Sequence, residues 1–305
     1  MPDNGMQRRD FLRNVGFGAM ALGAGPVLLG ACSTTNPSEV KKGGGTLEKI
    51  KKQGFITVGI AGEEPFGFVD KDGKLTGEAP ALAKVIFPEL GVKQVKQVQV
   101  KFEGLIPGLQ AGQFDATAAG MSILPDRCKK VTFADPDYKT LTAFLVPKGN
   151  PEHITRFEDV AKDSGLTLGV MSGAVEGDFA KKLGVKPGQI KTFPDPASGF
   201  DGLSAKRVDA IALTGFSLRS LLSKHSGAPF EVTEQFAPVI NGQKQVSAGG
   251  FAFRNADTDL VAAFNQKLEA AKKNGTLLKT LKPFGFTEEE MPGDLTAKQL
   301  CNMKM

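Results

Sequence analysis

One short stretch of the sequence, AAGMSILPDRC at 118–128, combines a hydroxyl, a proline and a guanidinium. The apolar run at its start stops at Ser122, and Arg127 stands directly before a cysteine. An arginine at the mouth of a buried strand can hold a planar anion through two parallel hydrogen bonds, and carboxylate is the usual anion. The alternative is an arginine that pairs with a neighbouring aspartate on a loop. These residues by themselves leave both interpretations open.

Metal and nucleophile chemistry find little support in the rest of the sequence. The two histidines, His153 and His225, are far apart, and no His, Cys or Asp cluster has metal-ligand spacing. We therefore expect no metal and no cofactor. Neither histidine has a nucleophile or an acid near it in sequence, so surface positions are expected for both.

The composition is that of a soluble globular protein. The chain has 305 residues, of which 41% are hydrophobic and 23% charged, enough for one or two sizeable cores. The net charge of +5 comes from 38 Lys and Arg against 33 Asp and Glu, spread along the chain without a basic block. This pattern argues against a nucleic-acid partner.

Residues 1–31 have the pattern of an export signal rather than of a folded element. The segment QRRDFLR (7–13) resembles a twin-arginine signal, and LGAC (29–32) resembles the lipobox of bacterial lipoproteins. A single transmembrane anchor is the alternative, but the apolar stretch is short and rich in glycine. We expect a lipid on Cys32, a flexible tether over 32–45, and a protein held at the membrane of the periplasm or cell envelope by that anchor alone.

Outside the cytoplasm the two remaining cysteines, Cys128 and Cys301, can form a disulfide. The bridge would tie the C-terminal tail to the loop of Arg127. On the chain-entropy model, closing so long a loop contributes roughly 4–5 kcal/mol of stability.

Alternating strand and helix patterns predict an α/β fold with largely parallel sheets. FITVGI (55–60) has the alternation of a strand, Asp72-Gly73 marks a tight turn, and 78–91 has helical periodicity. A second α/β run follows Pro147, and VSAGGFAFRN (246–255) resembles a strand that resumes the first unit.

We therefore predict two lobes, with the second inserted in the first. Lobe 1 comprises 46–146 and 249–305, and lobe 2 comprises 147–248, with crossings near 146–148 and 247–249. Two such lobes close around a small ligand like a hinge, at the carboxyl ends of their strands.

Four segments together resemble the solute-binding proteins of polar amino acid ABC transporters, bacterial extracellular solute-binding family 3. They are EEPFGFVDKDGKLTGEAPALA, FEGLIPGLQAGQFDATAAGMSILPDR, VTFADPDY and RVDAIA, and the resemblance covers nearly all of 46–290. GEAPALA, LIPGL and RC resemble the branch that binds ectoine and hydroxyectoine. The resemblance implies a two-lobed periplasmic-binding-protein fold and a monomeric, non-catalytic receptor that hands its ligand to an ABC permease and its ATPase.

The resemblance also implies a carboxylate site. Arg127 would bind the ligand carboxylate, with the hydroxyl or N–H of Ser122 and the carbonyl of Gly120 nearby. In the second lobe, the Gly-Thr pair common in the family is Gly173-Ala174 here, which leaves the backbone N–H groups of Ala174 and Val175 for the carboxylate.

At the other end of the ligand this sequence departs from the family. Amino acid binders place an aspartate for the α-ammonium where Thr214 stands. We therefore expect a delocalised, ring-bound or alkylated cation such as that of ectoine, because a buried ammonium without its partner is costly. Resemblance to the ectoine branch assigns Phe66, Phe102 and Glu63 to this cation, although a further aromatic of that branch is Ser122 here. Without the family, both phenylalanines would be taken as core residues.

Several alternatives stay open at this point. Ectoine or hydroxyectoine ranks first as ligand, a betaine-like or N-modified amino acid second, and a polar or cationic amino acid third. Either Glu63 or its neighbour Glu64 can be the carboxylate that faces the cation. An enzyme of dehydratase type on the same fold would need a general acid, for which Glu63, Glu64 and Glu176 are the candidates.

Overall fold

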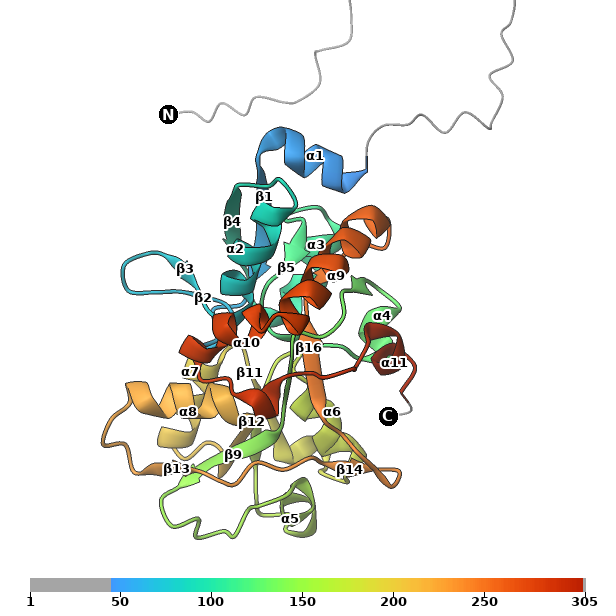
Figure 1. The fold of residues 1–305 in the computed structure, drawn as a ribbon. Coiled ribbons are helices and arrows are strands. Elements are labelled where there is room, and N and C mark those ends of the chain that lie inside the picture. Colours follow the sequence, from blue (N-terminus) through green and yellow to red (C-terminus); the bar gives the residue numbers. More distant parts are fainter. Residues whose placement is uncertain (1–44, 304–305) are drawn as a thin grey trace, which may run out of the picture. The chain divides into compact units, whose positions relative to one another are not determined.

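The computed structural model describes residues 45–303, shown as the coloured ribbon in Figure 1. The predicted export signal, the lipobox cysteine Cys32 and residues 32–44 of the predicted tether lie outside the described residues. Within 45–303, no helix combines the length and the apolar character that crossing a membrane requires. The described residues form two lobes.

The first lobe is built on a parallel sheet in the order β4-β1-β5. Its central strand, β1, coincides with the predicted strand FITVGI, whose side chains are mostly buried. The turn predicted at Asp72-Gly73 connects the β2–β3 hairpin, where Gly73 has a φ of 76°, a conformation that suits glycine. The strands are β1 (Phe55–Ile60), β2 (Phe68–Val69), β3 (Leu75–Thr76), β4 (Gln94–Gln99) and β5 (Ala116–Thr117).

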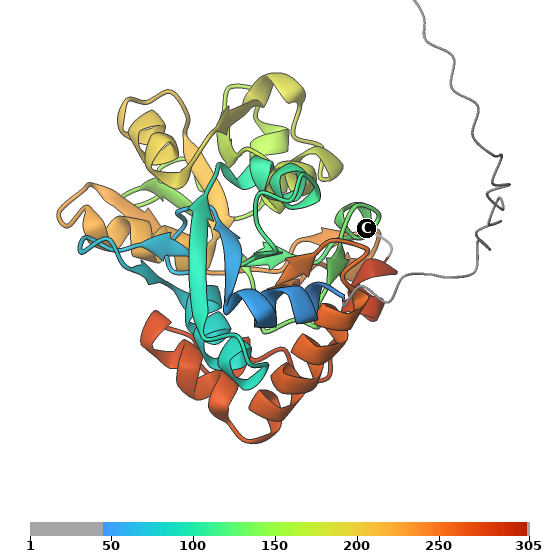
Figure 2. The same ribbon diagram turned by 90° about the horizontal axis from the view of Figure 1, so that it is seen from above.

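Helices from both ends of the described chain cover this sheet. Helix α1 lies beside α9 in both views, although more than 200 residues separate them in sequence (Figures 1 and 2). The helices of the first lobe are α1 (Thr46–Gln53), α2 (Glu78–Glu89), α3 (Leu105–Gln110), α4 (Pro125–Cys128), α9 (Thr258–Lys273), α10 (Thr276–Leu281) and α11 (Ala297–Cys301). Short 3-10 helices lie at Phe102–Gly104, Lys282–Phe284 and Glu288–Glu290.

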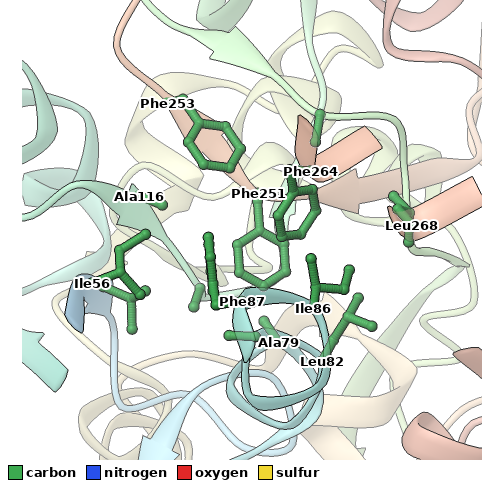
Figure 3. Close-up of a cluster of buried hydrophobic side chains, with 14 of the residues drawn as sticks. Ile56, Ala79, Leu82, Ile86, Phe87, Ala116, Phe251, Phe253, Phe264 and Leu268 are labelled. Carbon is green, nitrogen blue, oxygen red and sulfur yellow. The ribbon is translucent and has the colours of Figure 1, made fainter. Parts of the chain in front are cut away.

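One face of α2 supplies much of the core of this lobe (Figure 3). Its buried residues recur three and four positions apart, as expected for one face of a helix. They pack against phenylalanines from β17, α9 and the residue between β16 and β17, which come from the far end of the sequence. The residues of this cluster labelled in Figure 3 are Ile56, Ala79, Leu82, Ile86, Phe87, Ala116, Phe251, Phe253, Phe264 and Leu268.

Between the lobes, short antiparallel strands bring distant segments together. Strand β16 pairs with both β6 and β8, and β17 pairs with β7, so the chain returns to the first lobe at the segment predicted to resume it. These strands are β6 (Met121–Ser122), β7 (Thr132–Phe133), β8 (Tyr138–Thr140), β16 (Ser247–Gly250) and β17 (Ala252–Phe253).

The second lobe contains a five-stranded sheet in the order β11-β10-β12-β9-β13, in which β10, β11 and β12 are parallel. Its strands are β9 (Thr142–Pro147), β10 (Leu168–Met171), β11 (Ile190–Phe193), β12 (Ala210–Thr214) and β13 (Phe230–Val232), with a hairpin of β14 (Val239–Ile240) and β15 (Gln243–Lys244). Its helices are α5 (Phe157–Lys162), α6 (Val175–Lys182), α7 (Pro196–Ser204) and α8 (Gly215–Lys224), with a 3-10 turn at Pro187–Gln189.

The predicted lobe boundaries need a correction. Strand β9, which the prediction assigned to the first lobe, pairs antiparallel with β12 in the second-lobe sheet. The first crossing therefore falls at Leu141, between β8 and β9, and not near 146–148. The return crossing lies at 245–246, because β16 already belongs to the first lobe at Ser247. Pro147 is the last residue of β9, where it pairs with β13, and Pro151 lies in the loop that follows inside the second lobe.

A pair of acidic side chains, Glu78 and Asp137, is fully buried in the first lobe. Within the described residues, none of their four carboxyl oxygens has a hydrogen-bond partner. Burial raises the pKa of Asp137 to about 8, while the backbone N–H of Asp137 and the charge of Lys272 act in the opposite direction. Burial, followed by the charge of Asp137, raises the pKa of Glu78 well above its usual range. Asp137 is therefore mostly protonated at neutral pH.

This pair predicts that stability falls as the pH rises. In the unfolded chain both carboxyls ionise near pH 4, whereas in the folded protein Asp137 keeps its proton until about pH 8 and the pKa of Glu78 is raised in the same direction. The free energy of unfolding is highest at low pH, where both carboxyls are protonated. It falls as the pH rises through that window, by up to about 1.4 kcal/mol per pH unit and group. Glu78→Gln should flatten the fall in melting temperature between pH 5 and 9. The exposed Glu48→Gln is the control, and an unchanged slope in Glu78→Gln would count against the assignment.

Candidate functional site

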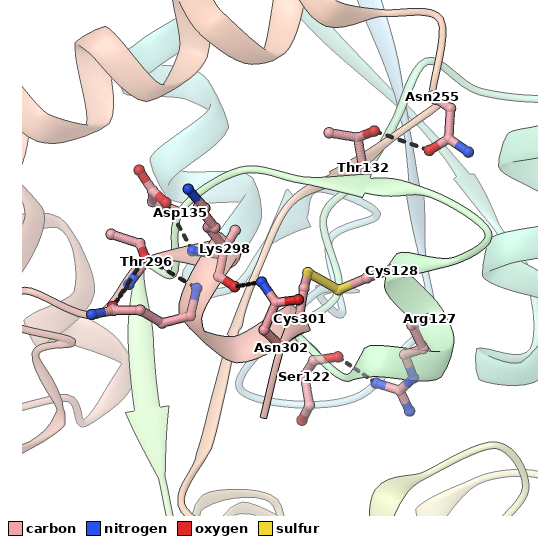
Figure 4. Close-up of a disulfide and its surroundings, with 12 residues drawn as sticks. Ser122, Arg127, Cys128, Thr132, Asp135, Asn255, Thr296, Lys298, Cys301 and Asn302 are labelled. Carbon is pink, nitrogen blue, oxygen red and sulfur yellow. Dashed lines mark hydrogen bonds between the residues drawn. A yellow bond between two sulfur atoms is a disulfide. The ribbon is translucent and has the colours of Figure 1, made fainter. Parts of the chain in front are cut away.

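Arg127 lies on the short helix α4, which a disulfide joins to the C-terminal segment. Pro125 begins this helix, and Cys128 is bonded to Cys301 of α11, with 5.7 Å between their Cα atoms (Figure 4). The structure thus contains the disulfide that the sequence predicted. Because Arg127 and Cys128 are adjacent, the bridge fixes the backbone from which the guanidinium extends.

The guanidinium of Arg127 reaches from the first lobe to the second. Its Nη1 donates to the carbonyl oxygen of Ser122 at 2.8 Å, and its Nη2 donates to the carbonyl oxygen of Gly173 at 2.7 Å. It also lies over the ring of Phe102, 5.4 Å from the centroid. Burial lowers the pKa of Arg127 below its usual value, but an arginine guanidinium stays charged at neutral pH.

Among the described residues, the structure does not contain the ion pair between Arg127 and a neighbouring aspartate that was one of its two interpretations. The neighbouring Asp126 pairs with Lys129 at 2.6 Å, not with Arg127. Both hydrogen bonds of the guanidinium go to neutral backbone carbonyls. An anion that enters between the lobes can therefore replace the carbonyl of Gly173 with a stronger, charge-assisted partner.

Residues predicted beside the carboxylate are only partly positioned to bind it. Ser122 is buried in β6, next to the guanidinium. The carbonyl oxygen of Gly120 accepts a hydrogen bond from the hydroxyl of Tyr138 at 2.6 Å. In the second lobe, the N–H of Ala174 donates to the carbonyl oxygen of Met171 at 3.1 Å, so it does not point to a ligand. Val175 begins α6, where a first-turn N–H has no partner within its own helix.

The structure places Phe66 in the core of the first lobe and not in an aromatic box. Its ring is 1% exposed and packs against Tyr138 and Phe286, with centroids 5.0 and 6.0 Å away. Gly120 lies directly against this ring, and a Cβ there would overlap it, which accounts for the glycine with its φ of 58°. Of the two predicted phenylalanines, Phe102 alone lies beside Arg127.

Glu63 bridges the lobes at the other side of the site. Its Oε1 accepts a 2.5 Å hydrogen bond from the hydroxyl of Ser217 on α8. Thr214 positions that serine, because its Oγ1 accepts from the N–H of Ser217 at 3.2 Å and donates to the serine hydroxyl at 3.0 Å. Burial raises the pKa of Glu63 to about 7, although the hydrogen bond from Ser217 acts in the opposite direction.

Glu64 is less buried than Glu63 and pairs with side chains of α8. It pairs with Lys224 at 2.5 Å and accepts a hydrogen bond from Ser220 at 3.3 Å, both on α8. Glu63 is buried, whereas the side chain of Glu64 is one-quarter exposed.

Glu176 is a site residue that sequence reasoning considered only as a possible general acid. It lies in the first turn of α6, is 1% exposed, and its Oε1 has no hydrogen-bond partner within the described residues. Burial is the main cause that raises the pKa of Glu176 to about 8, and the charge of Glu63 acts in the same direction. The backbone N–H of Glu176 and the charge of Arg127 lower this pKa. Glu176 thus lies close enough to Glu63 and Arg127 for their charges to act on its carboxyl. The sequence feature that could have indicated this residue is its place two positions after the Gly173-Ala174 pair.

A cavity of about 630 Å³ opens beside the Glu63–Ser217 contact. Both lobes contribute to its walls. Its lining residues are Ala61, Gly62, Glu64, Gln99, Val100, Lys101, Asp195, Pro196, Ala197, Ser217, Ser220, Leu221 and Lys224. Within the described residues, no group of three or more His, Cys, Asp or Glu side chains is arranged to hold a metal ion.

Comparison with known proteins gives a consistent family. Residues 56–287 match the family model of bacterial extracellular solute-binding proteins, family 3. A probable amino-acid ABC transporter periplasmic-binding protein, y4tE of Sinorhizobium fredii, is 34% identical over 84% of this chain and 86% of its own length. The L-cystine-binding protein TcyJ of Escherichia coli is 29% identical over 76% of this chain and 83% of its own.

The solved structures that this chain resembles are also binding proteins for small solutes. EhuB in complex with hydroxyectoine is 35% identical, has a TM-score of 0.78, and is matched over 85% of this chain and 98% of its own. An ancestral arginine-binding protein bound to arginine is 32% identical, with a TM-score of 0.67 over 76% and 99% of the two chains. This chain therefore belongs to the bacterial extracellular solute-binding proteins of family 3, the periplasmic receptors that deliver amino acids or related solutes to an ABC permease and its ATPase.

Proposed function

We propose that the solute is a zwitterion held between the lobes, with its carboxylate on Arg127 and its cation facing Glu63 and Glu176. The proposal is carried by two contacts that cross between the lobes, from the Arg127 guanidinium to Gly173 and from Ser217 to the buried carboxyl of Glu63. A second buried carboxyl, that of Glu176, has an oxygen without a hydrogen-bond partner among the described residues. A carboxylate would take both Nη groups of Arg127 and displace the carbonyl of Gly173. The unpartnered oxygen of Glu176 would accept an N–H from the cation.

The two carboxyls, Glu63 and Glu176, widen the range of ligand cations that was inferred from Thr214. The sequence suggested that a primary ammonium would be left without its main partner there, which favoured a delocalised cation. Glu63 and Glu176 supply negative charge from the two lobes, so the site has partners for any cation with N–H groups. Cation–π contacts carry less of the recognition than predicted, because Phe66 is in the core and Phe102 already lies under Arg127.

Ectoine and hydroxyectoine are the first candidates. Both combine a carboxylate with an amidinium whose ring N–H groups suit two carboxyl acceptors, and EhuB, solved with hydroxyectoine, is 35% identical to this chain. The second candidate is a polar or cationic amino acid, which the pair of carboxyls favours, and which agrees with an arginine-bound relative. Betaines carry a cation without N–H donors, so they cannot donate hydrogen bonds to Glu63 and Glu176.

A thermal-shift screen of residues 44–305, which form one compact unit, tests the proposal. The panel contains ectoine, hydroxyectoine, glycine betaine, proline betaine, arginine, lysine, histidine and glutamine. A ligand at a hundred times its dissociation constant stabilises by about 2.7 kcal/mol, a clear shift of the melting temperature. Shifts with the ectoines alone support the first candidate, and shifts with amino acids support the second. A betaine as the strongest ligand, or no shift at all, would contradict the proposed site. Recovery of the solute unchanged separates a receptor from a dehydratase.

Binding of the cation should strengthen as the pH rises. The pKa values of Glu63 and Glu176, about 7 and 8, mean that both carboxyls hold protons below neutral pH. A bound cation favours the ionised forms. Between pH 6 and 8 the ionised fraction of Glu63 rises about tenfold, and the association constant should follow. Calorimetric titration at both pH values measures this. Glu63→Gln should flatten the dependence and the exposed Glu288→Gln should not, whereas affinity that falls with pH would contradict the assignment.

We also propose that the mature protein is a monomeric lipoprotein anchored by acylated Cys32 after export by a twin-arginine signal. The support is the sequence of QRRDFLR and LGAC. Cys32→Ser should release the protein from the membrane fraction of the cell, and retention there would exclude this anchor.

A further inference from the structure

Two ion pairs cross from one lobe to the other outside the proposed zwitterion site. Nζ of Lys101, which follows β4 in the first lobe, lies 2.9 Å from Oδ2 of Asp195, which precedes α7 in the second. Nζ of Lys224, at the end of α8 in the second lobe, lies 2.5 Å from Oε1 of Glu64 in the first. Because the members of each pair lie in different lobes, both pairs form only while the lobes are together.

Neither pair uses an atom of the proposed site. Within the site, the hydrogen bonds that cross between the lobes join Arg127 to the carbonyl of Gly173 and Ser217 to Glu63. A bound solute rearranges these contacts, since its carboxylate replaces the carbonyl of Gly173 and its cation faces Glu63. The two ion pairs need no such exchange. They therefore favour the closed arrangement of the lobes whichever solute is bound.

Further hydrogen bonds fix the positions of both carboxylates. Oδ1 of Asp195 accepts from the N–H and the hydroxyl of Ser198, at 2.8 and 2.7 Å, which leaves Oδ2 for Lys101. Oε2 of Glu64 accepts from the hydroxyl of Ser220 at 3.3 Å, on the same helix as the lysine that binds Oε1. Asp195 is thus held by its own lobe, whereas both oxygens of Glu64 are bound by α8 of the other lobe.

Ion pairs of this kind act on binding through the fraction of the protein that is closed. Both lysines are more than half exposed, and an exposed pair changes an equilibrium by only about 1.4- to 5-fold. When a solute binds the closed form, the apparent dissociation constant is the intrinsic constant divided by the closed fraction. Two such pairs would therefore tighten binding by about 2- to 30-fold, and by the same factor for every solute.

We propose that the pairs Lys101–Asp195 and Glu64–Lys224 form an electrostatic latch that holds the lobes together with or without a solute. The latch positions the lobes and takes no part in the choice between solutes. The inference rests on the contacts between the lobes and not on the identity of the solute, so it applies equally to the ectoines and to amino acids.

Small-angle X-ray scattering of residues 44–305, without added solute, tests the latch directly. Lys101→Glu/Lys224→Glu turns both attractions into repulsions, so the lobes should separate and the radius of gyration should increase. The matched control, Lys51→Glu/Lys273→Glu, changes the net charge equally but breaks only pairs within α1 and within α9. Its radius of gyration should stay that of the unchanged protein. A latch variant that scatters like the control would overturn the proposal.

Calorimetric titration with ectoine, L-arginine and L-glutamine measures the effect on binding. Lys101→Glu/Lys224→Glu should weaken every solute that the unchanged protein binds by about fivefold or more, and by the same factor within about twofold. The control variant should leave each affinity within about twofold of the unchanged protein. The loss should shrink between about 0.05 and 0.5 M salt, because ions screen exposed charges.

Exchange of the two charges separates the latch from general damage to the fold. Lys224→Glu alone should weaken binding by about threefold or more, and Glu64→Lys/Lys224→Glu, which restores the attraction in reverse, should recover it to within about twofold. Failure to recover, or losses that differ between solutes by more than about twofold, would overturn the latch. If no solute binds the unchanged protein, the proposed zwitterion site is contradicted, and the scattering still decides on the latch.

Discussion

Replacing Arg127 with alanine should weaken binding of the zwitterionic solute by about 30- to 5,000-fold. The substitution leaves a buried carboxylate without its charged partner, and losses of this kind cost about 2–5 kcal/mol. Arg127→Lys should recover only part of the affinity, because lysine keeps the charge but cannot form two parallel hydrogen bonds with a carboxylate. Calorimetric titration with the strongest solute of the panel gives the dissociation constants.

The control for Arg127 is Lys129→Ala on the same loop. Lys129 is 74% exposed and pairs only with Asp126 among the described residues, so its loss removes the same charge without touching the site. Its affinity should stay within about twofold of the unchanged protein, as for exposed ion pairs generally. If Arg127→Ala bound the solute as tightly as Lys129→Ala does, the carboxylate of the solute would have to be held elsewhere.

Removing the disulfide should produce the largest loss of stability. The bridge joins residues 173 positions apart, and loss of a native disulfide of this kind costs about 2–5 kcal/mol. For a chain of this size the melting temperature should fall by about 5–15 °C. The double variant Cys128→Ser/Cys301→Ser, melted beside the oxidised protein, measures the effect.

Two comparisons separate the effect of losing the disulfide on stability from the effect of replacing the cysteine side chains. The unchanged protein in excess reductant should melt with the double variant, since both lack the bridge. Each single variant should be as unstable as the double one. A double variant that melts with the oxidised protein would show that the bridge adds no stability.

Much of the fold could be predicted because local pattern and tertiary environment agree. The alternation in 55–60 corresponds to β1, and the periodic segment from 78 corresponds to α2, whose apolar face packs into the core. Asp72-Gly73 forms its turn because glycine alone adopts that backbone conformation without strain. In each case a few neighbouring residues determine the outcome.

The lobe boundary depended on pairing that neighbouring residues do not reveal. The buried run TAFLVP is a strand by local pattern in either lobe, and its place is decided by β12, which lies more than 60 residues further along the chain. Pro147 and Pro151 drew the predicted boundary toward them, although Pro147 ends a strand of the second-lobe sheet and Pro151 lies in the loop after it.

The same distinction applies to the site. Arg127 could be proposed from its motif, whereas the choice between Glu63 and Glu64 stayed open, because it depends on contacts with α8 of the other lobe. The place of Phe66 could not be predicted, since the direction of its ring depends on packing with Tyr138 and Phe286. The role of Glu176 depends on burial against Glu63 and Arg127 from the other lobe, and sequence spacing carries no such information.

The most direct test of the central claim is a crystal structure of residues 44–305 with the solute that gives the largest thermal shift. The account predicts the solute between the lobes, with its carboxylate oxygens within about 3.2 Å of the Arg127 guanidinium and its cation facing Glu63 and Glu176. A solute bound with its carboxylate away from Arg127, or outside the interlobe space, would contradict it.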